Sequence, residues 1–145
     1  MSKFSDYSEA AIINWNLRGI PPSVPTGIFL ALFTDDPTDA NIVANELKTS
    51  GGAAPMPSYT RMNAAGAGAI ATGWTPPSDG VTKNTNTITF PANNGTLPVT
   101  IGWLGIYDAL TGGNLLYHSP LVSQKVLQPG DVLSFGANTI TITIA

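Results

Sequence analysis

The sequence predicts an all-β protein, a jelly-roll-like antiparallel β-sandwich of about eight strands with one N-terminal α-helix and long loops. The clearest observation is segment 138–145, where Thr and Ile alternate as in a strand with one buried face. Segments 98–108 and 114–119 flank the glycine-containing turn 109–113 and are expected to form a hairpin. The 12 prolines and 15 glycines indicate frequent turns between short strands.

The composition is that of one domain with few charges. The 145 residues can bury a hydrophobic core, and we expect an N-terminal helix or arm over 1–20 followed by a single β-sandwich domain over 21–145. Charged residues make up 10% of the chain, against roughly 25% in typical soluble domains. Neutral polar side chains therefore supply the solubility, and we expect other protein to cover part of the surface.

The same composition disfavours several classes of partner. The six Lys and Arg residues are scattered singly and the net charge is −3, so no direct nucleic-acid binding is expected, because that needs clustered cations. The chain has no cysteine, which excludes disulfides and thiolate chemistry. No apolar run approaches the roughly 20 residues of a membrane span, and the N-terminus lacks a signal peptide's apolar core. We expect a soluble protein made in the cytosol, without membrane contact.

Segment 4–18 is the one good helix candidate. Ser5 is expected to be its N-cap, and Gly19 with the prolines that follow is expected to end it. Apolar residues spaced by three and four form a stripe on this helix. They are Ala10, Ile13 and Leu17, with Tyr7, Ala11 and Trp15 alongside. The stripe has two interpretations: the helix packs on the domain's own core, or it is an arm that docks on a neighbouring subunit.

The first half of the chain combines one buried strand with irregular stretches. Segment 27–33 carries no charge and is interpreted as a strand buried on both faces. Three carboxylates follow it, but a calcium loop of the EF-hand type needs a longer ordered ligand set with a distal Glu, so we interpret them as turn residues. They are Asp35, Asp36 and Asp39. Segment 50–57 is expected to be a mobile loop, and Trp74 is interpreted as either a core plug or an exposed contact residue.

The remaining strands are predicted from short alternating or apolar segments bounded by turn residues. These segments are 59–62, 86–91, 125–127 and 132–135. Long loops in the first half and short turns in the second half are typical of a sandwich or jelly roll.

Residue chemistry gives no support for an enzyme, and we expect no catalytic, cofactor-binding or metal-binding residues. His118 is the single histidine, so neither a Ser-His-Asp set nor a two-histidine metal site can be argued from spacing, and we interpret it as a packing or hydrogen-bonding residue. Two-carboxylate glycosidase chemistry would need only Asp and Glu, but most of these lie in turns or in the helix. Asp108 ends a strand, where we expect it to cap the following loop.

Four segments carry a resemblance to a known family. They are IFLALFTDDPTDA over 28–40, ITFPA over 88–92, WLGIYDALTGGNLLYHSPL over 103–121, and the closing stretch with Lys125, Val126, Gly130, Asp131, Phe135 and the Ile-Thr repeat of 140–144. In these segments the chain resembles a family of small tailed-bacteriophage virion proteins, often labelled tail-fibre proteins. The third segment is the most specific, because its Gly, Asp and Asn residues hold their positions together.

The resemblance implies a non-enzymatic structural part of the phage virion, assembled in the host cytoplasm. Small jelly-roll proteins of this size resemble capsid cement or decoration proteins, which stabilise the head by bridging capsid subunits. We expect that role first, and a tail-fibre or receptor-binding module at the phage tail as the alternative.

The partners expected from this resemblance are the major capsid protein and copies of the chain itself, as a homodimer or homotrimer. No cofactor is implied. Large apolar or aromatic residues of the helix and of the irregular region are the expected interface contacts. They are Phe4, Tyr7, Trp15, Met56 and Trp74.

Overall fold

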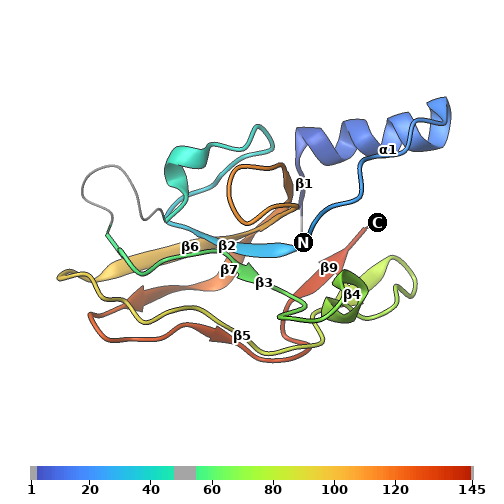
Figure 1. Cartoon of the computed structure of the whole chain (residues 1–145). Coiled ribbons are helices and arrows are strands. Elements are labelled where there is room, and N and C mark those ends of the chain that lie inside the picture. Colours follow the sequence, from blue (N-terminus) through green and yellow to red (C-terminus); the bar gives the residue numbers. More distant parts are fainter. Residues whose placement is uncertain (1–2, 48–54, 145) are drawn as a thin grey trace.

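A computed structural model describes residues 3–47 and 55–144 and shows a β-sandwich with one projecting helix (Figure 1). Within these ranges the chain forms one α-helix, nine strands and two short 3₁₀ turns, Val43–Asn45 and Ile70–Gly73. The helix and strands are α1 (Asp6–Arg18), β1 (Lys3–Phe4), β2 (Phe29–Phe33), β3 (Met62–Asn63), β4 (Val81–Lys83), β5 (Ile88–Thr89), β6 (Val99–Tyr107), β7 (Leu115–Leu127), β8 (Ser134–Phe135) and β9 (Thr141–Thr143). The predicted fold class is confirmed.

One layer is a five-stranded antiparallel sheet with the order β1-β7-β6-β2-β3. The other is made of two short pairs, β4-β9 and β5-β8. The predicted hairpin of segments 98–108 and 114–119 is present as β6 and β7, with Ile106 opposite Tyr117. The strand predicted within 27–33 is β2, at the interior of the sheet, where residues 30–33 are completely buried.

The main core lies between the two layers. Leucines of β2, Ile101 of β6 and Ile140 before β9 meet there with the rings of Tyr59 and Phe90, which stack at a centroid distance of 6.3 Å. A smaller cluster lies on the other face of the large sheet, where Phe33 stacks on Tyr107. Apolar side chains on both faces of β2 explain its uncharged sequence.

The Thr-Ile repeat is shorter as a strand than predicted. Ile140 and Ile142 are buried and Thr141 is exposed, as the alternation requires, but the ladder covers only Thr141–Thr143 rather than 138–145. The side chain of Asn84 takes the place of a neighbouring strand before Thr141: its Oδ1 accepts from the Ile140 amide at 2.8 Å and its Nδ2 donates to the Gly136 carbonyl at 2.8 Å.

The prediction of a separate short strand over 125–127 was wrong. These residues are the end of the 13-residue strand β7, with Thr100 of β6 opposite Val126. The register jumps from Ile101↔Lys125 to Trp103↔Pro120, so four residues, 121–124, bulge opposite Gly102. The proline and the polar run near this bulge hid the strand's continuity from the sequence pattern.

The other predicted strands are present in shortened or shifted form. Segments 86–91 and 132–135 reduce to β5 and β8, which pair with each other. Segment 59–62 contributes only Met62 to β3, because the side chains of Tyr59 and Arg61 turn into the interior. Most of the expected loop 50–57 lies outside the described residues. No helix in the described part of the chain is long and apolar enough to cross a membrane.

The helix begins and ends at the predicted caps. The Ser5 hydroxyl accepts from the Ser8 amide at 3.2 Å, and Gly19 closes the helix with a φ of 66°. Its first turn is tied to the sheet, because the Ser5 amide donates to Leu116 and the Asp6 amide donates to Asp39. The rest of α1 projects from the body (Figure 1), and Ser8 is its one buried residue.

Three residues of the predicted stripe on the helix do not pack on the domain's own core. Ala10, Ile13 and Leu17 are all exposed, Leu17 to 81%. Because the first turn of α1 is anchored to the body, the side of the helix that carries these residues faces solvent.

Candidate functional site

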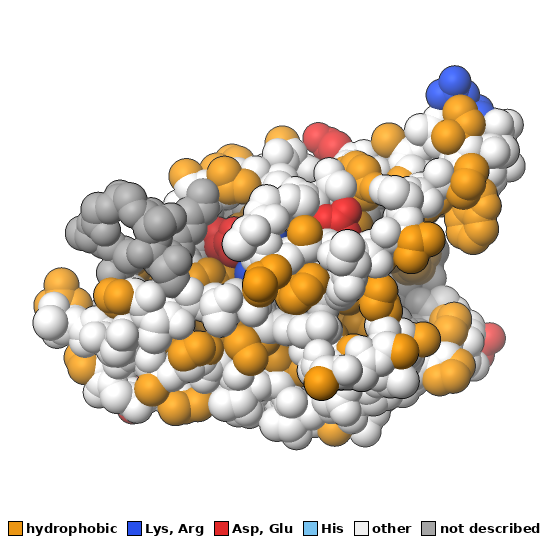
Figure 2. Space-filling model, viewed as in Figure 1, with side chains coloured by type: hydrophobic (Ala, Val, Ile, Leu, Met, Phe, Trp, Pro, Cys, Tyr) orange, Lys and Arg blue, Asp and Glu red, His pale blue; other side chains and the backbone are white. Residues whose placement is uncertain are grey.

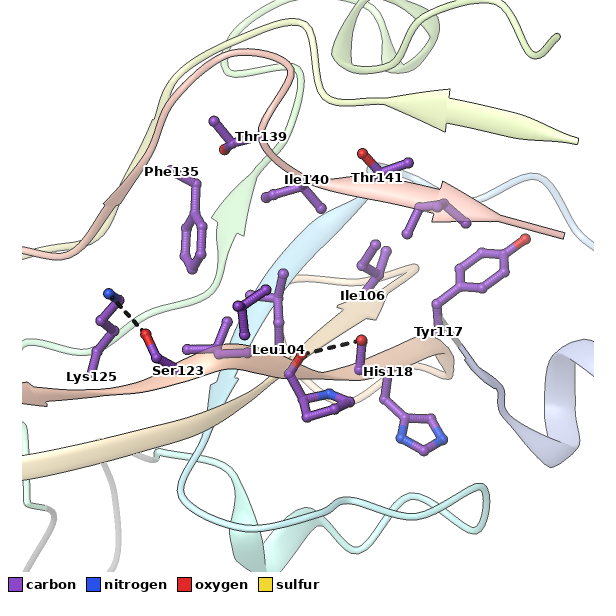
Figure 3. Close-up of a pocket in the computed structure, with 15 residues that line it drawn as sticks. Leu104, Ile106, Tyr117, His118, Ser123, Lys125, Phe135, Thr139, Ile140 and Thr141 are labelled. Carbon is purple, nitrogen blue, oxygen red and sulfur yellow. Dashed lines mark hydrogen bonds between the residues drawn. The ribbon is translucent and has the colours of Figure 1, made fainter. Parts of the chain in front are cut away.

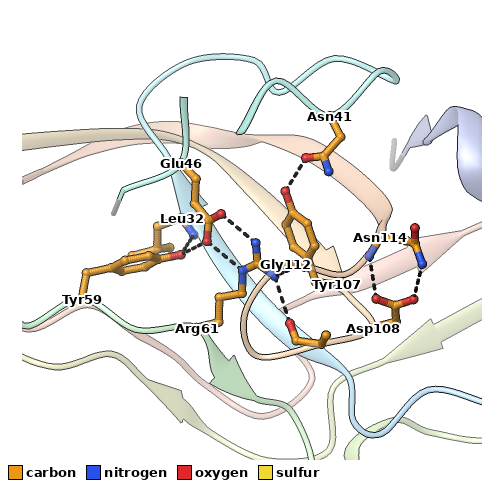
Figure 4. Close-up of polar contacts among 10 residues, drawn as sticks. Leu32, Asn41, Glu46, Tyr59, Arg61, Tyr107, Asp108, Gly112 and Asn114 are labelled. Atoms are coloured by element: carbon orange, nitrogen blue, oxygen red, sulfur yellow. Dashed lines mark hydrogen bonds and ion pairs between the residues drawn. The ribbon is translucent and has the colours of Figure 1, made fainter. Parts of the chain in front are cut away.

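A buried ion pair lies at the centre of the polar contacts (Figure 4). Arg61 Nε donates to Glu46 Oε1 and Arg61 Nη2 donates to Glu46 Oε2, both at 2.8 Å. The two side chains are only 6% and 5% exposed. Such a two-pronged contact is among the strongest polar interactions in proteins, because both carboxylate oxygens are satisfied at once.

The same guanidinium holds the hairpin loop between β6 and β7. Arg61 Nη1 donates to the carbonyl oxygens of Ala109 at 2.9 Å and Gly112 at 2.7 Å. The guanidinium carbon also lies 3.5 Å from the ring centroid of Tyr107, a cation–π contact. One side chain therefore links the segment before β3 to the loop that contains the Thr-Gly-Gly sequence.

Tyr59 completes the arrangement around Glu46. Its hydroxyl donates to Glu46 Oε1 at 2.9 Å and accepts from the Leu32 amide at 3.1 Å. Burial, reinforced by the Glu46 carboxylate, raises the pKa of the Tyr59 hydroxyl well above its ordinary value. Burial opposes the charge of Arg61, but the hydrogen bonds and charge of Glu46 outweigh it and hold the pKa of Arg61 above its ordinary value.

Asp108 caps the same loop, as predicted. Its Oδ1 accepts from the Asn114 amide at 2.6 Å and its Oδ2 accepts from Asn114 Nδ2 at 2.7 Å (Figure 4). The loop 109–113 is thus held by Arg61 inside and by Asp108 across its ends.

His118 is a hydrogen-bonding core residue, as predicted. It is 1% exposed, its Nε2 lies 2.8 Å from Asp39 Oδ1, and its Nδ1 lies 3.3 Å from Asp36 Oδ1. Its ring stacks on Trp103 at a centroid distance of 6.0 Å, and Lys3 Nζ lies 5.9 Å from the Trp103 ring.

The carboxylates after β2 form the predicted turn. Asp35 Oδ1 accepts from the Asp36 amide and Asp36 Oδ1 accepts from the Thr38 amide, each at 2.8 Å. Within 3–47 and 55–144 no group of three or more His, Asp or Glu side chains is placed to hold a metal ion.

These contacts give a structural reason for two of the sequence motifs. The turn of 35–39 follows β2, and His118 on β7 holds it through Asp39, while Asp108 at the end of β6 holds the loop 109–113 through Asn114. The arrangement positions backbone and leaves its charged groups engaged with one another. Sequence reasoning missed the pairing of Arg61 with Glu46, because 15 positions separate them and neither belongs to a regular pattern.

The predicted interface residues lie in three different settings. Trp15 is 59% exposed on the projecting helix, and Tyr7 is half-buried at its base. Phe4 pairs with β7 and packs on the Tyr117 ring at 5.2 Å. Trp74 is half-buried against the main core, closer to the core-plug interpretation. Met56 is completely buried in that core and exposes no surface in the single chain.

An apolar groove lies beside β7 on the surface of the sandwich. It has a volume of about 490 Å³ and lies between β7 on one side and β8 with β9 on the other (Figure 3). Leu104 and Ile106 form its floor, and Tyr117 and Phe135 stand at its sides. Sequence analysis did not find this groove, because no single segment contains it.

Two smaller hollows adjoin it. One of about 220 Å³ shares Ile106, Tyr117 and Ile142 with the groove and includes Trp74. The other, of about 230 Å³, lies under the helix and is lined by Tyr7 and Trp15. The apolar surface thus continues from the groove to the base of α1.

Comparison with known proteins gives one family. The chain matches the family described as podophage GP4 fiber I protein gp80 over residues 3–143. The search of curated proteins found no match. The family match covers nearly all of the chain, including both the helix and the sandwich.

Proposed function

Because the chain belongs to the family of the podophage GP4 fiber I protein gp80, and is thus a structural component of a phage virion, we propose that it is a non-enzymatic tail-fibre module. The observation that carries this proposal is the extent of the match, residues 3–143. The label of the family favours the tail over the head, which reverses the order expected from the sequence.

The contacts around Arg61 support a structural role. Its guanidinium, the Glu46 carboxylate and the Asp108 carboxylate are all engaged in holding loops. In catalytic sites, by contrast, groups of this kind converge on a cavity where a substrate can reach them. The groove itself is lined mainly by aliphatic and aromatic side chains, as protein-binding surfaces often are.

The size of the subunit implies that a fibre contains several copies. Its longest strand, β7, spans the same length as the nine-residue β6 with which it pairs, which corresponds to about 30 Å. A fibre that reaches further needs several subunits side by side or end to end. The expected partners are therefore further copies and a protein of the particle to which the first copy attaches.

A head cement role is the second candidate, with the major capsid protein as its partner. It is favoured by the projecting α1, whose exposed apolar residues suit an arm that lies across a neighbouring subunit. The low charge of the chain suits either role.

The copy number and location of the protein in purified particles test both candidates. We expect immunogold labelling at the tail and a copy number, measured by quantitative mass spectrometry against the major capsid protein, of a few dozen or fewer, as tail symmetry dictates. Hundreds of copies with label over the head would favour the cement role instead. Absence from particles would contradict both.

A further inference from the structure

The projecting helix has apolar residues on two sides. At 100° per residue, Ser8, Ile12 and Trp15 face the body and line the hollow at the base of the helix. Ala10, Ile13 and Leu17 lie on the other side, where Ile13 is 55% and Leu17 81% exposed. Apolar residues along the projecting helix are visible in Figure 2. A helix that is apolar on two sides is typical of one that is covered on both.

The spacing of the outward residues is that of a docking helix. Ala10, Ile13 and Leu17 stand at positions i, i+3 and i+7, the pattern of anchors with which an amphipathic helix enters an apolar groove. We call these three residues the outward stripe. The chain's own body cannot cover it, because the first turn of α1 is fixed to the sheet through Ser5 and Asp6.

The groove between β7 and β9 is the matching concave surface. Apolar side chains make up much of its lining, with Leu104, Ile106, Ile140 and Ile142 among them. Figure 3 shows this lining. It is open because the second layer consists of two short strand pairs, which do not cover the β7 side of the large sheet. Val122, at the rim, is fully exposed.

Beyond its pairing with β1 at Tyr117 and His118, β7 forms the edge of the large sheet, and this edge is protected against the addition of a strand. Pro120 has no amide hydrogen, and the four-residue bulge of 121–124 breaks the ladder beside it. Both features are typical of edges protected from strand pairing. A helix, which satisfies its own backbone groups, is therefore a better occupant of this groove than an extended segment.

The helix and the groove carry opposite charges. Lys125 stands at the groove, and within the described residues it makes no ion pair; its Nζ contacts Ser123 Oγ at 3.4 Å. Asp6 and Glu9 lie in the first turn of α1, ahead of the outward stripe, and are exposed. Exposed ion pairs add little affinity, but they select one orientation of two apolar surfaces.

We propose that the outward stripe of α1 in one copy docks in the apolar groove of a second copy of this chain, with Asp6 and Glu9 beside Lys125. Each copy carries one outward stripe and one groove, so a single kind of contact between copies buries both surfaces. Reciprocal docking gives a dimer, and onward docking gives a closed ring. This contact deepens the proposed function by naming the partner of each subunit. Its place in the virion rests on that proposed function.

Disulfide trapping tests the contact directly, because the chain contains no cysteine. We expect Leu17→Cys and Val122→Cys variants, mixed and mildly oxidised, to form a covalent pair that reductant reverses, and neither variant alone to do so efficiently. Both positions are exposed, so the substitutions leave the fold intact. Efficient pairing of Leu17→Cys with itself would instead indicate a helix-to-helix contact and overturn the proposal, as would the absence of a mixed pair.

Sedimentation of the full chain gives the second test. We expect a concentration-dependent oligomer whose dissociation constant rises about tenfold or more in Leu17→Glu. Leu97→Glu, at a position that is 69% exposed and outside the groove, is the matched control and is expected to leave the constant unchanged. A wild-type chain that stays monomeric, or equal effects of the two variants, would overturn the proposal.

A charge exchange tests the orientation. Lys125→Glu is expected to weaken the oligomer, and combining it with Glu9→Lys is expected to restore it, since the pair is then reversed. Failure of the double variant to recover would contradict the orientation proposed. All three tests use the purified chain, so their failure is distinct from failure of the tail location, which is read on particles.

Discussion

Arg61 connects more parts of the molecule than any other side chain in the contacts described above. Its guanidinium joins Glu46, the loop carbonyls of Ala109 and Gly112, and the face of Tyr107. Buried ion pairs contribute little net stability compared with well-packed apolar residues, but removing one partner leaves an uncompensated charge. The sensitivity of the fold to Arg61 therefore depends on what is left at Glu46.

The first prediction separates these two effects. Arg61→Met is expected to lower the free energy of unfolding by about 3–5 kcal/mol, because it leaves the Glu46 carboxylate buried without its cation. Arg61→Met combined with Glu46→Leu is expected to recover a large part of that loss. Urea unfolding followed by circular dichroism measures both. A double variant as unstable as the single one would show that the loop contacts, rather than the buried charge, dominate.

Single residues were predictable from sequence where their role is local. Ser5 as N-cap, Gly19 as the helix end and Asp108 as a loop cap each act on neighbours within a few positions. Arg61 and Met56 were not, because what surrounds them comes from distant segments. A methionine beside prolines in an irregular stretch carries no sign that strands will close over it.

The hairpin loop 109–113 is the element that the family motif specifies most closely. Gly112 and Gly113 both have a positive φ, 61° and 69°, which L side chains rarely adopt. They differ in the space around them. A Cβ at Gly113 would lie 2.5 Å from Asp108 Oδ1 and 2.6 Å from Ala109 Cβ, while one at Gly112 would meet no atom of the described residues within 4 Å.

The second prediction uses Gly112 as the control for Gly113. Gly112→Ala is expected to cost about 1–2 kcal/mol of stability, the backbone cost of a left-handed conformation. Gly113→Ala is expected to cost more, because the added methyl also displaces the Asp108 carboxylate that holds Asn114. Thermal and urea unfolding of the two variants give the comparison. Equal losses of stability in the two variants would mean that the Asp108 side chain can move away from the added methyl group at no cost in free energy.

At the level of elements, sequence periodicity predicted which segments form strands better than it predicted how long those strands are. The alternation of Thr and Ile correctly placed Ile140 and Ile142 in the core, but an asparagine side chain, Asn84, set where the ladder begins. The length of β7 was hidden by Pro120 and a bulge, which a long neighbouring strand, β6, tolerates. Strand ends are decided by neighbours in space.

At the scale of the whole molecule, the sandwich class followed from pattern and composition, whereas the open groove did not. The groove exists because two short strand pairs face a five-stranded sheet, and this mismatch in width appears only after folding. The same closure buries phenol groups from separate segments beside one carboxylate, Glu46, and so links global stability to pH.

The third prediction concerns that link. Burial, reinforced by Glu46, raises the pKa of Tyr107 to about 12 and that of Tyr59 further, and burial alone raises the pKa of Tyr117. In the unfolded chain these phenols ionise near their ordinary value of about 10. Above that pH the unfolded state has released protons that the folded state still holds, so stability falls as pH rises. Below it, the contribution of these groups is fully present.

We therefore expect the urea midpoint to be insensitive to these tyrosines below about pH 10 and to fall as pH rises toward 12, where the folded Tyr107 itself ionises. Tyrosinate absorbance from three of the four tyrosines is expected to appear late and together with the loss of the circular dichroism signal. Tyr107→Phe removes one of these groups and is expected to make the fall of the midpoint shallower. Full tyrosinate absorbance near pH 10 with the folded signal intact would contradict the burial of these hydroxyls, and with it the closure of the sheet over Glu46.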